Sequence, residues 1–214
     1  MSNVAHPAGD NDVGDASSDL GVGHPVDFFD LARHQRAHRA FRDNPVSDAT
    51  VERLLVAATH APSAENCQPW EFVVVREPQT RAALGSLMAE IWQSVRAYSE
   101  SRLDPTLFAD VDAGLAGGGV AAAPVLIVVC VDTDRVHPGA VASSAFPAVQ
   151  NLLLAATALG LGSALTTIAT QHAARLRGML GLAEGIDPVA VVPIGHPVRA
   201  LGPSRREPPR ITRR

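Results

Sequence analysis

The chain has 214 residues, which is enough for one ordinary domain with a sizeable hydrophobic core. Hydrophobic residues make up 46% of it and aromatic residues only 4%, which favours closely packed helices in a globular protein. The formal net charge of -4 gives no electrostatic case for general binding to nucleic acid or to a membrane surface. The last eleven residues, 204–214, are locally basic.

The two cysteines, Cys67 and Cys130, lie far apart and form no CxxC motif. This spacing argues against a disulfide framework and a zinc site, and it fits a reducing cytoplasm. The first 26 residues lack the charged and apolar regions of a signal peptide. No apolar run reaches the roughly 20 residues of a membrane span. We therefore expect a cytoplasmic protein.

The N-terminal half is predicted to be mainly helical. Residues 1–25 are rich in Gly, Asp and Ser, so we expect a disordered or loosely attached tail, followed by a single domain over residues 26–214. The expected elements are a short helix over 26–35, a helix over 48–60 capped by Ser47, a strand over 72–76 and a helix over 78–98 that opens on Pro78. Residues 99–119 look irregular, and the pattern leaves open whether they form a mobile flap or an insertion.

The C-terminal half alternates strands and helices. The expected elements are a strand buried on both faces over 124–131, a very apolar helix over 143–159 closed by Gly160, a short strand over 163–167, a helix capped by Thr170 and running to 180, and a strand over 189–194. The helix over 143–159 is hydrophobic nearly all round, which places it at a domain centre or at a subunit interface. The order of elements predicts an α/β or α+β sheet sandwiched by helices.

The connection from Ala61 to Trp70 is unusually polar for a link between two apolar elements. Prolines flank it, and four hydrogen-bonding side chains lie between them: Ser63, Glu65, Asn66 and Gln68. One interpretation is a loop whose side chains satisfy only their own backbone. The other is a binding loop, and the residues alone do not decide between the two.

Other motif searches exclude several classes of site. Gly21-Val22-Gly23 and Gly160-Leu161-Gly162 both lack the strand, glycine and helix order of a dinucleotide fingerprint. The sequence contains no GxxxxGK[ST], HExxH or GxSxG motif. His34 and His38 lie four residues apart, but no carboxylate or cysteine nearby completes a metal set. No metal site is expected.

Arginines form two groups that are candidates for an anion site. Arg36 and Arg39 lie three residues apart just after the first short helix, and Arg205 and Arg206 lie in the extended C-terminal tail. The simple interpretation is a solvated basic edge. The alternative is a site that uses planar, permanently charged guanidinium groups to hold an anion such as a phosphate.

Together these segments resemble the FMN-dependent nitroreductase family. The resemblance rests on four segments in order: Arg36-Ala37-His38-Arg39-Ala40-Phe41, the loop Ala61 to Trp70 against the family's APS-x-x-N-x-QPW, Gln150 to Ala156 with Gly160 to Ser163, and Ile194-Gly195-His196-Pro197 followed by the two tail arginines. The resemblance covers about residues 28–209. It implies an α+β fold with a central, mainly antiparallel or mixed sheet sandwiched by helices, in a homodimer.

The resemblance also implies where a flavin would bind. FMN would lie in a cleft at the subunit interface, with Arg36, Arg205 and Arg206 at its phosphate and Arg39 near the flavin N1. Pro62, Ser63, Ala64, Asn66 and Gln68 would reach the flavin from the partner subunit. The remaining cofactor contacts would be Ala37, Leu165, Thr166 and Thr167. No residue would be catalytic, because the flavin carries the chemistry. Gln35, Ala37 and Leu165 to Thr167 depart from residues common in the family.

The implied activity is that of an NAD(P)H oxidoreductase. NADH or NADPH would reduce the flavin, and a small acceptor such as a nitroaromatic or a quinone would then take the electrons at the same face, giving ping-pong kinetics. The alternative is a flavin-binding, sequestering or sensor protein without reductase turnover. The sequence does not choose between the two nicotinamides or name the acceptor.

Overall fold

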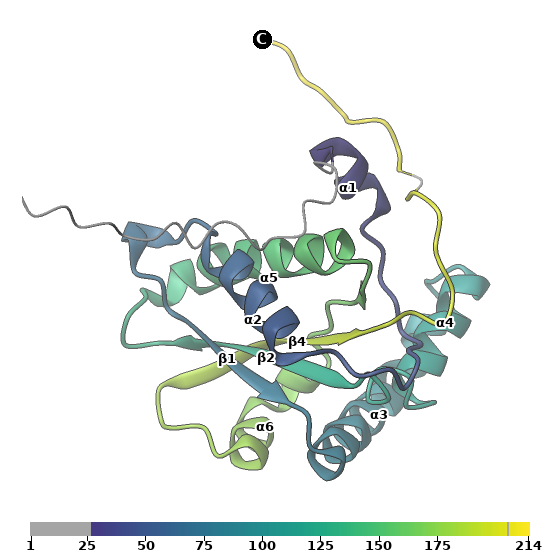
Figure 1. Cartoon of the computed structure of the whole chain (residues 1–214), viewed down its shortest axis with the longest axis horizontal. Helices are drawn as coiled ribbons and strands as arrows, with labels where there is room; N and C mark the ends of the chain where they lie inside the picture. The colour runs from purple at the N-terminus through teal and green to yellow at the C-terminus, as the bar shows by residue number, and fades with distance from the viewer. Residues whose placement is uncertain (1–26, 205) are drawn as a thin grey trace, which may run out of the picture.

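The computed structural model of the chain describes residues 27–204 and 206–214 (Figure 1). Its centre is a four-stranded antiparallel sheet with strand order β1-β2-β4-β3. The strands are β1 (Trp70–Val75), β2 (Val125–Asp132), β3 (Gly162–Ser163) and β4 (Ile186–Gly195). The predicted tail over residues 1–25 lies outside the described residues, and Arg205 does too.

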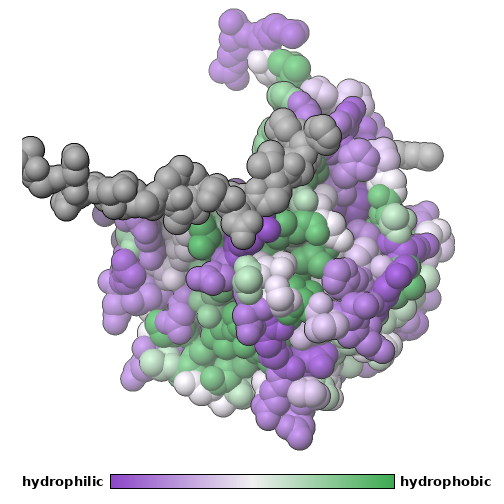
Figure 2. Space-filling view, in the orientation of Figure 1, coloured by the Kyte–Doolittle hydropathy of each residue, from purple (hydrophilic) through white to green (hydrophobic). Residues whose placement is uncertain are grey.

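Helices cover both faces of this sheet (Figure 1). One face packs against α2 (Asp48–Thr59) and α5 (Val141–Ala158). The other packs against α3 (Pro78–Glu100), α4 (Pro105–Leu115) and α6 (Ala173–Leu180), while the short α1 (Phe28–His34) contacts α5. This arrangement confirms the predicted α+β fold class. Figure 2 shows separate hydrophobic and hydrophilic areas on one side of the molecule, with the hydrophilic C-terminal end at the top.

The alternation of side chains along β2 explains why the sheet needs two helical layers. Ile127 and Val129 belong to the cluster beneath α2 and α5, whereas Leu126 and Val128 belong to the cluster beneath α3 and α6. All four are fully buried. The prediction of a strand buried on both faces is confirmed, because a β-strand points successive side chains to opposite sides.

Three of the residues predicted to begin or end helices lie at the ends of α2, α3 and α5. Ser47 Oγ accepts a hydrogen bond from the Thr50 N–H at 3.2 Å, which caps α2. Pro78 occupies the first turn of α3, where its missing N–H costs nothing. Gly160 follows α5 with φ of +71°, a left-handed conformation that favours glycine.

Three expectations about local structure were wrong. Residues 99–119 contain a regular helix, α4, because Asp104 accepts from the Thr106 N–H at 2.9 Å and Pro105 opens the helix. The strand expected over 163–167 is regular only at Gly162–Ser163, with a separate bridge from Thr166 to Val191. Thr170 is no cap, since a 3₁₀ turn comes first and α6 begins at Ala173.

The helical segment Pro138–Ala158 is long and apolar enough, by length and composition, to cross a membrane, which the sequence analysis did not anticipate. Its core side chains, including Leu152 and Ala156, are fully buried against the sheet. This is the burial of a helix at a domain centre. On the same helical layer Phe146 and Val56 keep 36% and 52% of their surface exposed, so residues 27–204 and 206–214 leave part of this layer uncovered.

Candidate functional site

Residues 36–41, which we call the arginine segment, begin beside β3. Ala37 forms a parallel bridge to Ser163, and the His38 N–H donates to the Ser163 carbonyl at 2.8 Å. Phe41 is buried and pairs with Pro197 just beyond β4. The start of the domain, the segment after α5 and the start of the C-terminal tail therefore meet at one end of the sheet.

Arg36 is held against the C-terminal tail. Its Nη1 donates to the Gly202 carbonyl at 2.9 Å and approaches the Pro203 carbonyl at 3.4 Å, while the Ser204 N–H donates to the Arg33 carbonyl at 2.8 Å. None of the ion pairs found between described residues involves Arg36. Among the described residues, its charge is met by carbonyl dipoles and by no carboxylate, so it can also interact with an anion.

Arg206 lies near the same place. It lines a hollow of about 590 Å³ together with side chains of α1 and the tail, namely Phe29, Ala32, Arg33, Gln35 and Ser204. The structure therefore places Arg206 beside Gln35, the neighbour of Arg36 in the chain, and Arg36 itself contacts the tail at Gly202 and Pro203. The other predicted tail arginine, Arg205, lies outside the described residues.

Arg39 points to a different partner from Arg36. Its Nη1 lies 2.6 Å from Asp110 Oδ2, and its side chain is only 19% exposed. Asp110 was not among the residues predicted from the sequence, because no helix was expected over residues 99–119. The signal was present in the helical spacing of Asp110 and Gly114, which lie on one face of α4.

His38 sits between the two arginines and is half-buried. Burial lowers its pKa below the ordinary value of 6.5, and the nearby charge of Arg36 lowers the pKa further, against a smaller opposing effect from Asp110. The imidazole is therefore neutral at pH 7. A neutral ring adds no charge to the pair of arginines that flank it.

The segment after β3 offers backbone and hydroxyl groups. Ser163 Oγ is buried and has no hydrogen-bond partner among the described residues. Thr166 exchanges two backbone hydrogen bonds with Val191 at 3.0 and 2.8 Å, so it extends the sheet edge beyond β3. Leu165 is 41% exposed, and Thr167 is also exposed. An orphaned buried hydroxyl beside an exposed segment is typical of a binding site.

The polar loop between α2 and β1 holds a strained backbone. Glu65, Asn66 and Gln68 have φ of +52°, +54° and +46°, and they are the only non-glycine residues with positive φ in the described part of the chain. Such conformations cost on the order of 1–3 kcal/mol each and cluster at functional sites. The concentration of all three in this loop favours the binding interpretation over the inert one.

Three hydrogen bonds that involve side chains help to hold this loop in place. Ser63 Oγ accepts from the Gln68 N–H at 3.0 Å, and Gln68 Nε2 donates to Asn66 Oδ1 at 3.0 Å. The Ala64 N–H donates to Ser144 Oγ of α5 at 3.1 Å. Ser144 is fully buried and was also missed by the sequence analysis, since a serine within an apolar helix gives no distinct signal. Pro62 is exposed at the start of the loop.

The loop and the arginine segment lie at opposite ends of α5. Ala64 contacts Ser144 near its beginning, whereas α1 encloses a hollow with Thr157 and Ala158 at its end. At 1.5 Å per residue these two ends are about 20 Å apart. Within one chain, the structure therefore places Arg36 against the tail and Ala37 beside Ser163, while the loop residues lie apart from them at the other end of α5. Thr166 lies further along the sheet edge, opposite Val191.

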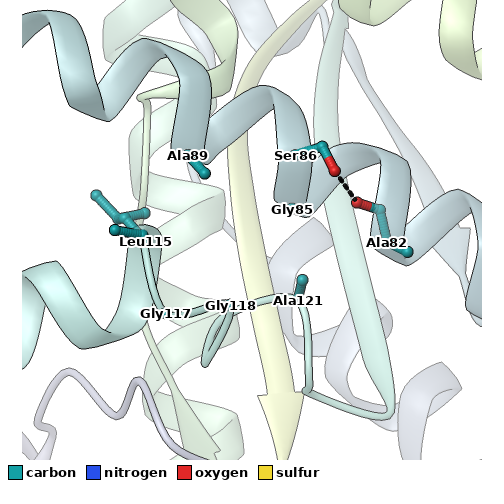
Figure 3. Close-up of a pocket in the computed structure, with 9 residues that line it drawn as sticks. Ala82, Gly85, Ser86, Ala89, Leu115, Gly117, Gly118 and Ala121 are labelled. Carbon is teal, nitrogen blue, oxygen red and sulfur yellow. Dashed lines mark hydrogen bonds between the residues drawn. The ribbon is translucent and has the colours of Figure 1, made fainter.

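A hollow of about 300 Å³ lies between α3 and the end of α4 (Figure 3). Its walls are small or apolar, with Ala89, Leu115 and Ala121 around the glycines of the 117–118 turn. It offers no charged side chain for an anion. No cluster of three or more potential metal ligands occurs among the described residues.

Comparison with known proteins decides the family. Residues 32–196 match the model of the nitroreductase family, which is more than half of the chain. The chain belongs to the nitroreductase family. The resemblance read from the four sequence segments is therefore confirmed.

Relatives of this nitroreductase-family chain carry oxidoreductase names. It is 30% identical over 180 residues to a Methanothermobacter thermautotrophicus protein whose name assigns it provisionally to the NADH dehydrogenases and NAD(P)H nitroreductases; the match covers 83% of this chain and 81% of the relative. It is 31% identical over 196 residues to the NADH dehydrogenase of Thermus thermophilus, covering 86% and 93%.

One similar solved structure contains a flavin. A nitroreductase-like protein from Desulfovibrio desulfuricans was crystallised in complex with FMN. It is 28% identical to this chain, with a TM-score of 0.65 over 87% of this chain and 94% of that one. The fold of the nitroreductase family is therefore present here, and the Desulfovibrio protein of that fold binds FMN.

Proposed function

We propose that the chain forms a homodimer that binds FMN at the subunit interface and acts as an NAD(P)H oxidoreductase on a small acceptor. The observation that carries this proposal is the position of the two candidate groups at opposite ends of α5. A two-fold axis beside α5 would bring the loop of one subunit to the arginine segment of the other. The partly uncovered α2 and α5 layer, with Phe146 and Val56, supplies apolar surface for such contact.

The phosphate of FMN would be held by Arg36 and Arg206, with Arg205 beside them. A phosphomonoester carries about -1.5 to -2 charges at neutral pH, so it needs more than one cation. Arginine suits this role because its planar fork makes two parallel hydrogen bonds to phosphate oxygens. Arg36 fits because it contacts carbonyl oxygens and no carboxylate among the described residues.

The flavin ring would lie between the segment after β3 and the partner's loop. Arg39 would place a positive charge near the flavin N1, and Ala37, Leu165, Thr166 and Thr167 would line the ring edge. Pro62, Ser63, Ala64, Asn66 and Gln68 of the partner subunit would contact the same ring. The orphaned Ser163 Oγ is a further polar group that the bound cofactor would satisfy.

When bound, FMN supplies the electron-transfer chemistry by accepting a hydride and passing electrons on. The protein's own residues would bind and orient it, and Arg39 would stabilise the negative charge that reduction adds. No acid, base or nucleophile of the chain is required. NADH or NADPH and then a nitroaromatic, a quinone or a related acceptor would use one open face in turn, which produces ping-pong kinetics.

The visible spectrum of the purified protein tests this proposal. We expect flavin absorption in the protein as isolated or after FMN is added, and bleaching when NADH or NADPH is added without oxygen. Steady-state rates with a nitro or quinone acceptor should give parallel double-reciprocal lines. A protein that stays colourless with added FMN would refute the proposal, and a bound flavin that neither nicotinamide reduces would favour flavin storage or sensing instead.

A further inference from the structure

Arg39 contacts two residues of α4, Asp110 and Gly114, and the family resemblance gives neither of them a role. Its guanidinium Nη1 lies 2.6 Å from Asp110 Oδ2, with side-chain exposures of 19% for Arg39 and 37% for Asp110. Because the pair is partly buried, its geometry is better defined than that of a fully solvated pair. A carboxylate this close can affect both the position and the effective charge of Arg39.

The helix that carries Asp110 is fixed independently from its other side. Asp112, two residues on, accepts from Trp92 Nε1 at 2.7 Å and from Arg96 Nε at 2.9 Å, and both donors lie on α3. These hydrogen bonds, with that from Arg96 first, lower the pKa of Asp112, which keeps the carboxylate charged. The position of α4, and with it the backbone of Asp110, is therefore fixed by contacts other than the one with Arg39.

The face of α4 that carries Asp110 is shaped to receive the Arg39 side chain. Gly114 lies four residues after Asp110, one helical turn along the same face. A Cβ atom at Gly114 would lie 2.7 Å from Arg39 Cδ and 2.8 Å from its Cβ, which is closer than real atoms approach. At Gly119 a Cβ would lie 2.3 Å from the Arg39 carbonyl oxygen. Because both positions are glycine, the Arg39 side chain can pack against α4 at Gly114, and the Arg39 backbone can pack against Gly119.

We propose that Asp110, Gly114 and Gly119 form a seat for Arg39, and that Asp110 is a positioning residue that also sets the charge Arg39 presents to the flavin. This inference rests on the proposed function, because it takes Arg39 to lie beside FMN. The carboxylate at hydrogen-bonding distance offsets part of the guanidinium charge. Reduction adds negative charge to the flavin, so a less neutralised Arg39 favours the reduced form.

The Asp110→Asn variant tests the charge alone. Asparagine keeps an oxygen that can accept from Arg39 but removes the negative charge. We expect the preference for reduced over oxidised FMN to rise about tenfold, which is a midpoint potential about 30 mV more positive for a two-electron couple. The measurement is the redox titration of the bound flavin, together with the dissociation constant of oxidised FMN.

Asp112→Asn is the matched control. It makes the same charge change on the same helix, but on the side that faces α3, so it should lower thermal stability and leave the flavin potential at the wild-type value. Gly114→Ala tests the shape of the seat with all charges kept. The added methyl group displaces Arg39, so FMN should bind about tenfold more weakly, with no increase in potential.

The outcomes separate the two proposals. If the wild-type protein binds no FMN, the proposed function fails. If the wild type binds FMN and either folded variant, Asp110→Asn or Gly114→Ala, matches it in both potential and affinity, the proposed function stands and the seat for Arg39 is refuted. An equal shift in Asp112→Asn and Asp110→Asn would also refute it, since a general charge effect would then explain the result.

Discussion

The hydrogen bond between the Ala64 N–H and Ser144 Oγ should control how well the strained loop binds flavin. It joins residues 80 positions apart in the chain and connects the loop to α5, where Cys67 of the loop also packs against the buried cluster that includes Ala145. Ser144→Ala removes the acceptor and leaves the Ala64 N–H without it, which costs about 1–3 kcal/mol. The left-handed conformations of Glu65, Asn66 and Gln68 already cost on the order of 1–3 kcal/mol each. Without the hydrogen bond to Ser144, the loop backbone should therefore shift readily to a less strained conformation.

We therefore expect the substitution to make the loop less ordered while the protein stays folded. If about 1.4 kcal/mol of the cost falls on ordering the loop in the bound state, FMN affinity falls tenfold. The assay is titration of FMN fluorescence with each variant, accompanied by urea unfolding to measure global stability. The free energy of unfolding should fall by no more than about 3 kcal/mol.

Ser143→Ala is the matched control for this prediction. Ser143 is the neighbouring residue on the same helix, but it is exposed and its Oγ donates only to the Ala140 carbonyl at 3.1 Å. Its loss should leave FMN affinity at the wild-type value. The reasoning is wrong if Ser144→Ala binds FMN as tightly as the wild type, or if Ser143→Ala weakens binding equally.

Two further predictions concern titratable groups. Burial raises the pKa of the Cys130 thiol to about 12, whereas Cys67 is only half-buried in the loop between α2 and β1, so a thiol reagent should label Cys67 first. FMN should slow that labelling, because we propose that it binds beside this loop. Equal labelling of both thiols in the folded protein would contradict this prediction. The lowered pKa of His38 means that the unfolded chain binds its proton more readily, so stability should rise with pH up to the ordinary value of 6.5 and level off above it. His38→Gln should flatten that rise in a series of thermal melts from pH 5 to 8, and an unchanged slope would show that other groups cause it.

Local signals in the sequence were sufficient where one residue type has one structural use. Ser47 and Pro78 begin helices, and the continuous apolar run of β2 is buried on both faces, because each of these follows from backbone chemistry alone. Asp104 and Pro105 show the limit of such signals. This pair follows the end of α3 and begins α4, so it can be interpreted as a break or as a helix start. Only the helical spacing of the residues after Pro105 indicates α4.

Contacts across the fold were beyond the reach of the sequence. Arg36 was expected to point at a phosphate, and nothing local indicated that carbonyls of the tail would orient it. The pairing of Arg39 with Asp110 joins residues 71 positions apart. The strain at Glu65, Asn66 and Gln68 was equally hidden, because none of these is a glycine whose presence would have signalled a left-handed backbone.

Mixing two defective homodimers tests the shared flavin site most directly. Arg36→Ala damages the arginine side and Asn66→Ala damages the loop side, and each variant alone should bind FMN poorly. If each site combines Arg36 of one subunit with the partner's loop, a heterodimer contains one intact site and one site with both defects. We predict that the mixed sample, after subunit exchange, recovers one tightly bound FMN per heterodimer. No recovery of FMN binding after confirmed exchange, or a protein that stays monomeric while it binds FMN, would contradict the account.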